Sequence, residues 1–230
     1  MKLNITKIIL AFALSIGSSH CFSQGFVNLD FESATIVPVS GDSYNRVEFA
    51  PAFPGWTGSV GGDVQTLALY NNIFLDSSGI GIFDTNQVID GNYTAMLEAG
   101  LGLGSSQPSN TTLSQTAVVP SDALSLLFEA STWGEANSFA VSMNGQTLSL
   151  TPLSTTSSYT LYGVNIRAWA GQSATLAFTV FAQQPHVNNN FLYLDDLQFS
   201  SSSVPEPGIL GLFAIGGLFF GLRYWRNSSQ

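Results

Sequence analysis

Short runs of alternating apolar and polar residues dominate the chain between residues 26 and 200. In the first run, residues 26–32, the apolar side chains of Val27, Leu29 and Phe31 alternate with polar ones. A repeat of two is expected of a β-strand that buries one face. Further strand-like runs cover residues 93–99, 112–118, 124–130, 138–144, 146–150, 159–164, 174–182 and 191–200.

Turn residues separate these runs and favour antiparallel neighbours. Asn144-Gly145 lies between two runs and is a strong signal for a two-residue hairpin. No segment between the two termini sustains the 3.6-residue apolar repeat of a helix. The pattern predicts an all-β fold, an antiparallel β-sandwich of the jelly-roll type over residues 24–200. We expect the first and last strands to lie near each other.

The N-terminal segment, residues 1–23, has the pattern of a secretory signal peptide. Two lysines precede the apolar stretch from Ile8 to Gly17. This stretch is too short to span a bilayer, which takes about 20 residues. Small side chains at Cys21 and Ser23 favour cleavage after Ser23. The alternative is a lipoprotein that is cleaved at Cys21.

The C-terminal segment, residues 208–230, has the pattern of a short transmembrane helix with a basic cytoplasmic tail. The run from Gly208 to Leu222 carries no charge. As a helix it reaches about 22 Å, at about 1.5 Å per residue. Arg223 and Arg226 follow it, and the positive-inside rule places them on the cytoplasmic side. The body is therefore expected on the far side of the inner membrane.

A Ser/Pro-rich linker, residues 201–207, joins the body to this helix. It ends in Val204, Pro205, Glu206 and Pro207, and the two prolines favour an extended backbone that a protease can reach. This motif, followed by a Gly-rich apolar run and basic residues, resembles the PEP-CTERM sorting signal of Gram-negative bacteria. The resemblance implies export, transient anchoring in the inner membrane, processing by the membrane protease exosortase, and a final location at the cell surface or outside the cell.

The charge balance excludes one class of partner. Between residues 24 and 203 the chain has two basic and 14 acidic residues, a balance of −12. Proteins that bind a phosphate backbone need clustered Lys and Arg. Nucleic acid is therefore excluded as a partner.

Several short sequence stretches of the body, taken in their order along the chain, carry a second resemblance. The body resembles the jelly-roll domains of carbohydrate-binding modules and galactose-binding-like proteins. The stretches that carry this resemblance are, in chain order, "VNLDFES", "FPGWTG", "DGNYTAMLEAG", "TLSQTAVV", "VNIRAWAGQSATLAFTV" and "LYLDDLQFS". The resemblance spans most of residues 26–200 and implies the same fold. It also implies sugar binding, although this architecture serves structural roles as well.

Asp195 is an unusual residue of the body, because strict alternation with Phe191, Tyr193 and Leu197 aims its carboxylate at a buried face. A buried charge needs a partner. The alternatives are an arginine, hydroxyl and backbone N–H donors, a bulge that turns the side chain outward, or a cation. In the resembling modules, acidic residues of the first and last strands share a structural calcium. The matching residues here are Asp30, Glu32, Asp195 and Asp196, which offer the hard oxygen ligands that calcium takes.

Trp133 is the candidate for sugar binding, because exposed aromatic rings stack on the C–H face of a pyranose. It lies with Glu135 and Asn137 in "STWGEANS", at the end of a predicted strand. Core packing is nevertheless the preferred interpretation for Trp133, as it is for Trp56 and Trp169.

No catalytic motif supports an enzyme, since the chain has no GxSxG, HExxH or phosphate loop. The preferred hypothesis is a non-catalytic exported protein that binds or organises exopolysaccharide of a cell surface or biofilm matrix. The alternatives are a structural matrix protein without a discrete ligand and a polysaccharide-active enzyme.

Overall fold

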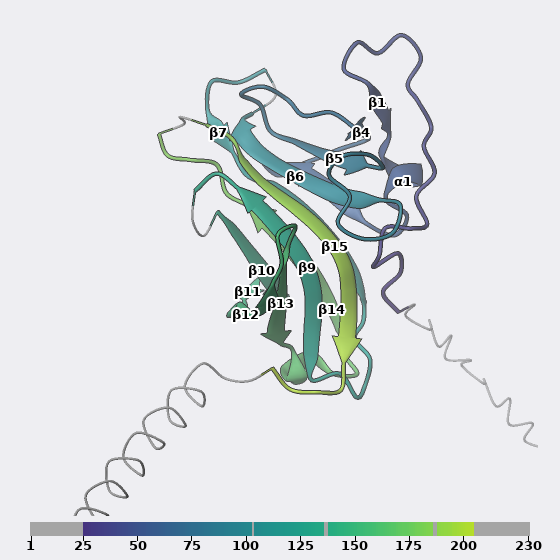
Figure 1. The fold of residues 1–230 in the computed structure, drawn as a ribbon, viewed down its shortest axis with the longest axis vertical. Coiled ribbons are helices and arrows are strands. Elements are labelled where there is room, and N and C mark those ends of the chain that lie inside the picture. Colours follow the sequence, from purple (N-terminus) through teal and green to yellow (C-terminus); the bar gives the residue numbers. More distant parts are fainter. Residues whose placement is uncertain (1–24, 103, 136–137, 186–187, 205–230) are drawn as a thin grey trace, which may run out of the picture.

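Two β-sheets pack face to face, which confirms the predicted β-sandwich (Figure 1). The computed structural model describes residues 25–102, 104–135, 138–185 and 188–204. Helices are short, namely α1 (Phe49–Ala52) and the 3₁₀ turn η1 (Arg167–Trp169).

The larger sheet has nine strands, and β15 lies in its middle. Its order is β1–β4–β5–β6–β15–β9–β13–β12, with β7 paired to β6. All pairs between these strands are antiparallel except β4 with β5. The strand bounds are β1 Arg46–Glu48, β4 Leu67–Tyr70, β5 Gly79–Phe83, β6 Thr94–Leu101, β7 Pro108–Ser109, β9 Ser125–Trp133, β12 Thr151–Thr155, β13 Thr160–Asn165 and β15 Asn190–Ser200.

The smaller sheet has six strands in the order β11–β10–β14–β8–β2–β3. Their bounds are β2 Thr57–Val60, β3 Asp63–Val64, β8 Thr111–Val118, β10 Phe139–Met143, β11 Gln146–Thr147 and β14 Ser173–Val180. The hairpin between β10 and β11 confirms the turn signal. Asn144 and Gly145 both have positive φ, as a tight two-residue hairpin requires.

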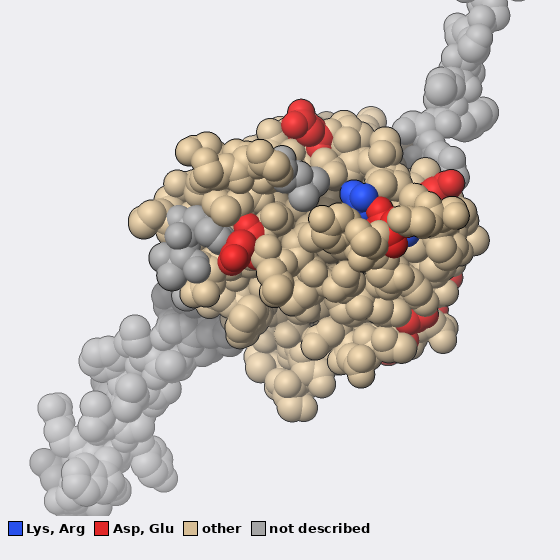
Figure 2. Space-filling view, turned by 90° about the horizontal axis from the view of Figure 1, so that it is seen from above, with Lys and Arg blue, Asp and Glu red and all other residues tan. Residues whose placement is uncertain are grey.

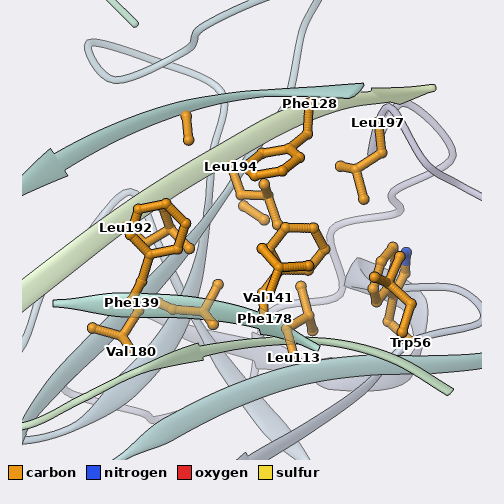
Figure 3. Packing of buried hydrophobic residues seen from close by; sticks show 14 of the residues in the cluster. Trp56, Leu113, Phe128, Phe139, Val141, Phe178, Val180, Leu192, Leu194 and Leu197 are labelled. Carbon is orange, nitrogen blue, oxygen red and sulfur yellow. The ribbon is translucent and has the colours of Figure 1, made fainter. Parts of the chain in front are cut away.

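The core lies between the two sheets and consists of alternate side chains of their strands. In β15 the face predicted for the core is wrong: Leu192 and Leu194 enter it, whereas Phe191 and Tyr193 lie on the other face. Phe128 of β9 and Leu192 and Leu194 of β15 point toward Leu113, Phe178 and Val180 of the other sheet (Figure 3). The rings of Phe128 and Phe178 meet edge to face, with centroids 5.2 Å apart. Such ring pairs add to the stabilisation from buried area.

One predicted strand is wrong. Residues 26–32 form turns rather than a strand, because Asn28 and Phe31 have positive φ. The segment nevertheless runs beside the last strand, as expected. Leu197 N donates to Leu29 O at 3.0 Å, and the rings of Phe26 and Phe199 lie 5.1 Å apart.

Replacing Phe128 by alanine should cost about 3–5 kcal/mol of unfolding free energy, because the ring is fully buried and its loss leaves a cavity between the sheets. Urea unfolding followed by tryptophan fluorescence measures the change. Phe181→Ala is the matched control, since that ring is well exposed. Equal losses in the two variants would contradict the placement of the core.

Candidate functional site

The outer face of the nine-stranded sheet, which points away from the other sheet, carries a second apolar cluster. Leu69, Phe83, Met96 and Phe191 are buried there, and Phe74 and Tyr193 pack against them. These side chains come from β4, β5, β6 and β15 and from the loop after β4. The outer face is therefore partly covered by loops rather than bare.

Trp133 extends this cluster into solvent. It is the last residue of β9 and pairs with Phe191 of β15. The two ring centroids are 5.4 Å apart, yet the indole remains 67% exposed. The core-packing interpretation is therefore wrong for Trp133: its ring is supported from one side and open to solvent.

The chain turns sharply after Trp133, and β15 holds the turn. Gly134 has a φ of +118° and lies so close to Asn190 that a Cβ at this position would collide with the Asn190 amide. The backbone N–H of Glu135 donates to Asn190 Oδ1 at 2.8 Å. Glu135 itself is exposed and lies two residues after Trp133 in the chain.

A second pair of residues, both half-buried, continues the same face of the sheet next to Trp133. Tyr193 of β15 pairs with Ser131 of β9, two residues before the Phe191–Trp133 pair. Side chains two residues apart on a strand share a face and lie about 7 Å apart. Trp133, Ser131 and Tyr193 therefore form one strip, which we call the Trp133 strip.

The other two tryptophans of the body pack against the core. Trp56 is buried, and its indole N–H donates to Asn28 O at 2.9 Å. Trp169 is partly buried against the same core. Neither ring offers a free face comparable with that of Trp133.

Asp195 is buried on the outer face of the nine-stranded sheet, at 1% exposure. Its partners are hydrogen-bond donors of the protein. Oδ2 accepts from the hydroxyl of Thr94 and the backbone N–H of Asp90, and Oδ1 accepts from the backbone N–H of Asp196. Burial raises the pKa of Asp195 to about 7, against the effect of these donors. A bulge follows it, and Asp196 there has positive φ. Asp195 lies on the outer face, not on the core face that alternation predicts, and it stays buried because the loop at Asp90 covers it.

Glu32 binds the loop that contains Asp90, the residue whose backbone N–H donates to Asp195. Its Oε1 accepts from the backbone N–H groups of Asn92 and Tyr93, at 2.6 and 2.9 Å, and its Oε2 from the Asn92 amide. Burial opposes ionisation, but these donors lower the pKa of Glu32 below its usual value. Glu32 and Asp195 thus clamp one segment, residues 90–93, between the first turns and the last strand.

This geometry bears on the predicted calcium site. Asp30 accepts from Glu32 N at 3.3 Å, and both Asp196 carboxylate oxygens accept from the Gln198 amide. In the part of the chain that the structure describes, no group of three or more His, Cys, Asp or Glu residues is placed to hold a metal ion. The four acidic residues do not fit a shared cation, because their oxygens face N–H and O–H donors. A calcium ion here stays a prediction.

Glu98 is a buried carboxyl that the sequence analysis missed. It is fully buried in β6, next to Phe191. Oε2 accepts from Phe74 N at 2.8 Å, and Oε1 from the Asn189 amide at 2.6 Å. Burial raises its pKa to about 8. Glu98 therefore fastens the loop after β4 and the start of β15 to the outer face.

A groove of about 520 Å³ lies beyond this loop. It is lined by Tyr44, Arg46, Ile73, Phe74, Leu75, Ser77 and Gly104. Tyr44 is 53% and Leu75 86% exposed. Arg46 lies 5.3 Å from the Tyr44 ring centroid and donates through Nε to Asp42 Oδ2 at 2.8 Å. Its cation is therefore already paired, and the groove is a second candidate for a ligand.

Charged side chains are sparse on the surface. Figure 2 shows one end of the molecule with most of its area uncharged and a few acidic groups scattered over it. Stacking and hydrogen bonds to neutral groups suit such a surface better than charge pairing does.

Several predicted residues lie outside the described part of the chain. They are the signal peptide at residues 1–23, Asn137, the motif residues Pro205, Glu206 and Pro207, and the predicted helix with Arg223 and Arg226 at residues 208–230. Within the residues that are described, no helix is long and apolar enough to cross a membrane. Val204 is described and is half-buried.

Comparison with protein families identifies the tail. A family model described as the PEP-CTERM protein-sorting motif matches residues 203–227. The chain carries a PEP-CTERM sorting motif. The motif implies export, transient anchoring in the membrane before processing, and exosortase as the processing partner.

The comparisons add little on the body. No curated protein matched the chain. Among solved structures, it is similar to the enzymatically active domain of tailspike protein 4 of bacteriophage CBA120, at 12% identity and a TM-score of 0.37. The match covers 64% of this chain and 19% of the tailspike chain.

Glu98→Gln should flatten the pH dependence of stability. The pKa of Glu98 is about 8 in the folded protein and about 4.3 in an unfolded chain, so the folded state holds the extra proton between these values. The stability that this proton contributes is present below about pH 4 and is lost as the pH rises toward 8.

We therefore expect the unfolding free energy of the parent to fall between about pH 5 and about pH 8, and to fall less steeply in Glu98→Gln, whatever that change does to overall stability. Asp195 contributes with the same sign in both proteins. Urea titrations at each pH measure the slope, with the exposed Glu48→Gln as the control. Equal slopes in Glu98→Gln and parent would refute the assignment.

Proposed function

We propose that the body is a non-catalytic polysaccharide-binding domain of an exported, sorted protein, and that it binds a neutral exopolysaccharide at the Trp133 strip. The exposed indole of Trp133 carries this proposal. The indole is not an isolated exposed residue, because it adjoins the apolar cluster around Phe191, and exposed apolar patches mark binding sites. The flat apolar face of the indole matches the C–H face of a pyranose ring.

The support behind the indole favours binding over chance exposure. Phe191 lies behind the ring, and Asn190 fixes the turn that follows it. A ring held in this way loses little conformational freedom when a ligand stacks on it. The hydroxyls of Ser131 and Tyr193 and the carboxylate of Glu135 supply polar groups near the strip.

The charge balance favours a neutral polymer. The body carries a large excess of acidic residues, and the described cation in the groove, Arg46, is paired with Asp42. An acidic polysaccharide would be repelled by this field. A neutral polysaccharide is not repelled by the acidic residues.

The arrangement of the acidic residues supports a non-catalytic role. Glycoside hydrolysis needs two carboxyl groups on either side of a scissile bond. Glu129 of β9 lies opposite Asp195, and burial raises its pKa. Asp195, however, is covered and accepts three hydrogen bonds from the protein. These contacts favour a role in holding the loop over a role in touching a substrate.

Trp133→Ala should weaken binding to neutral glycans about tenfold or more, which corresponds to about 1.4 kcal/mol. The measurement is binding of the purified body to an array of neutral and acidic polysaccharides, followed by titration of the best binder. Trp133→Phe should retain part of the affinity, because it keeps a stacking face.

Tyr44→Ala is the matched control, since it removes an exposed ring from the other groove. A loss of binding in Tyr44→Ala but not in Trp133→Ala would move the site to that groove. Absence of any glycan binding by the parent would favour a structural matrix protein. Release of shorter sugars from a polysaccharide would favour the enzyme.

A further inference from the structure

The chain that follows β15 stays attached to the sandwich. Ser200 is the last residue of β15 that pairs with β9, and its carbonyl accepts from Leu124 N at 2.8 Å. Two residues later, the carbonyl of Ser202 accepts from the hydroxyl of Ser125 at 2.7 Å. Ser125 is buried. The predicted linker is thus hydrogen-bonded through Ser202 to the start of β9, where Figure 1 shows the chain leaving β15.

Val204 fills a space that a glycine leaves open. A Cβ added to Gly163 in β13 would lie 2.7 Å from Val204 Cγ2, and 3.2 and 3.3 Å from the side chains of Leu153 and Leu127. Gly163 does not have a positive φ, so its backbone does not require glycine. Because Gly163 has no Cβ, it leaves room for the Val204 side chain.

These contacts overlap the sorting motif. The matched residues begin at Ser203, so Val204, the second of them, lies on the folded body. A protease binds its substrate as an extended strand with free backbone groups. Segments that are hydrogen-bonded and packed on a domain are cut only after they open locally. Ser200 and Ser202 are held by hydrogen bonds and Val204 by packing, so we expect cleavage within residues 200–204 to require local opening of the body.

We propose that the folded body sets the N-terminal limit of processing: the sorting cleavage falls on the C-terminal side of Val204, and Val204 remains seated over Gly163 in the mature protein. In this step a peptide C–N bond breaks. The carbonyl carbon gains the oxygen of a water molecule, and the nitrogen of the released tail gains a proton. The inference rests on the sorting motif and is independent of glycan binding, so either can fail alone.

The C-terminus of the processed protein tests the cleavage position. The full chain is expressed in its native host, and the processed form is digested with trypsin, which cuts after Arg167. Mass spectrometry then reads the last peptide, which begins at Ala168. We expect every processed product to include Val204. A product that ends at Ser203 or earlier would overturn the proposal.

A promiscuous protease tests whether the body gives the protection. The uncut full chain, from a host that lacks exosortase, is held in detergent and trimmed with proteinase K. Parent protein should be trimmed to Val204 or to a later residue. Ser125→Ala combined with Gly163→Ala removes the hydrogen bond and displaces Val204 without changing the motif. In this variant, trimming within residues 201–204 should be at least about tenfold faster, because cleavage follows the population of the open form.

The control combines Ser157→Ala with Gly25→Ala, since Ser157 is exposed and a Cβ on Gly25 would meet open space. A melting curve verifies that each variant is folded. Val204→Asp is the second variant, because it leaves the body unchanged and places a charge where an apolar side chain fits. Equal trimming of parent, Val204→Asp and the double variant would overturn the proposal.

Discussion

The pairing of β15 between β6 and β9 is the constraint on which the rest of the structure depends. This last strand lies in the middle of the larger sheet, so the sheet is incomplete until the end of the body has been made. The two faces of β15 lie in different environments. Leu192 and Leu194 enter the core between the sheets, while Phe191 and Asp195 face outward and need cover. Since a buried carboxylate without donors is costly, the loops that supply donors to Asp195 are fixed in place as well.

The sequence predicts the strands that have one buried face and one polar face. Alternation locates β8, β10 and β14, and Asn144-Gly145 locates a hairpin, because these signals are local. β5 and β6 are buried on both faces and have no polar face; the sequence still predicts β6, over residues 93–99, but it misses β5. The first predicted strand is wrong because positive φ at Asn28 and Phe31 breaks it, and this depends on tertiary packing of Phe31. Local pattern cannot reveal such long-range effects.

The candidate site is predictable only in part. The sequence singles out Trp133, but its exposure depends on Gly134 and on Asn190, which is distant in the chain. It also singles out Asp195 as a residue that needs a partner. That partner is a loop that Glu32 holds as well, and alternation does not show loop contacts. The groove beside Tyr44 escapes sequence analysis because separate segments line it.

The two ends of β9 place the exit of the tail and the candidate binding site far apart. Ser125, at the start of the strand, holds the segment that leads to the sorting motif, and Trp133 is its last residue. Nine residues of strand separate the two by roughly 26 Å, at about 3.3 Å per residue. The segment that leads to the sorting motif therefore leaves the body at the end of the sandwich opposite the Trp133 strip, so contacts at one end do not overlap those at the other.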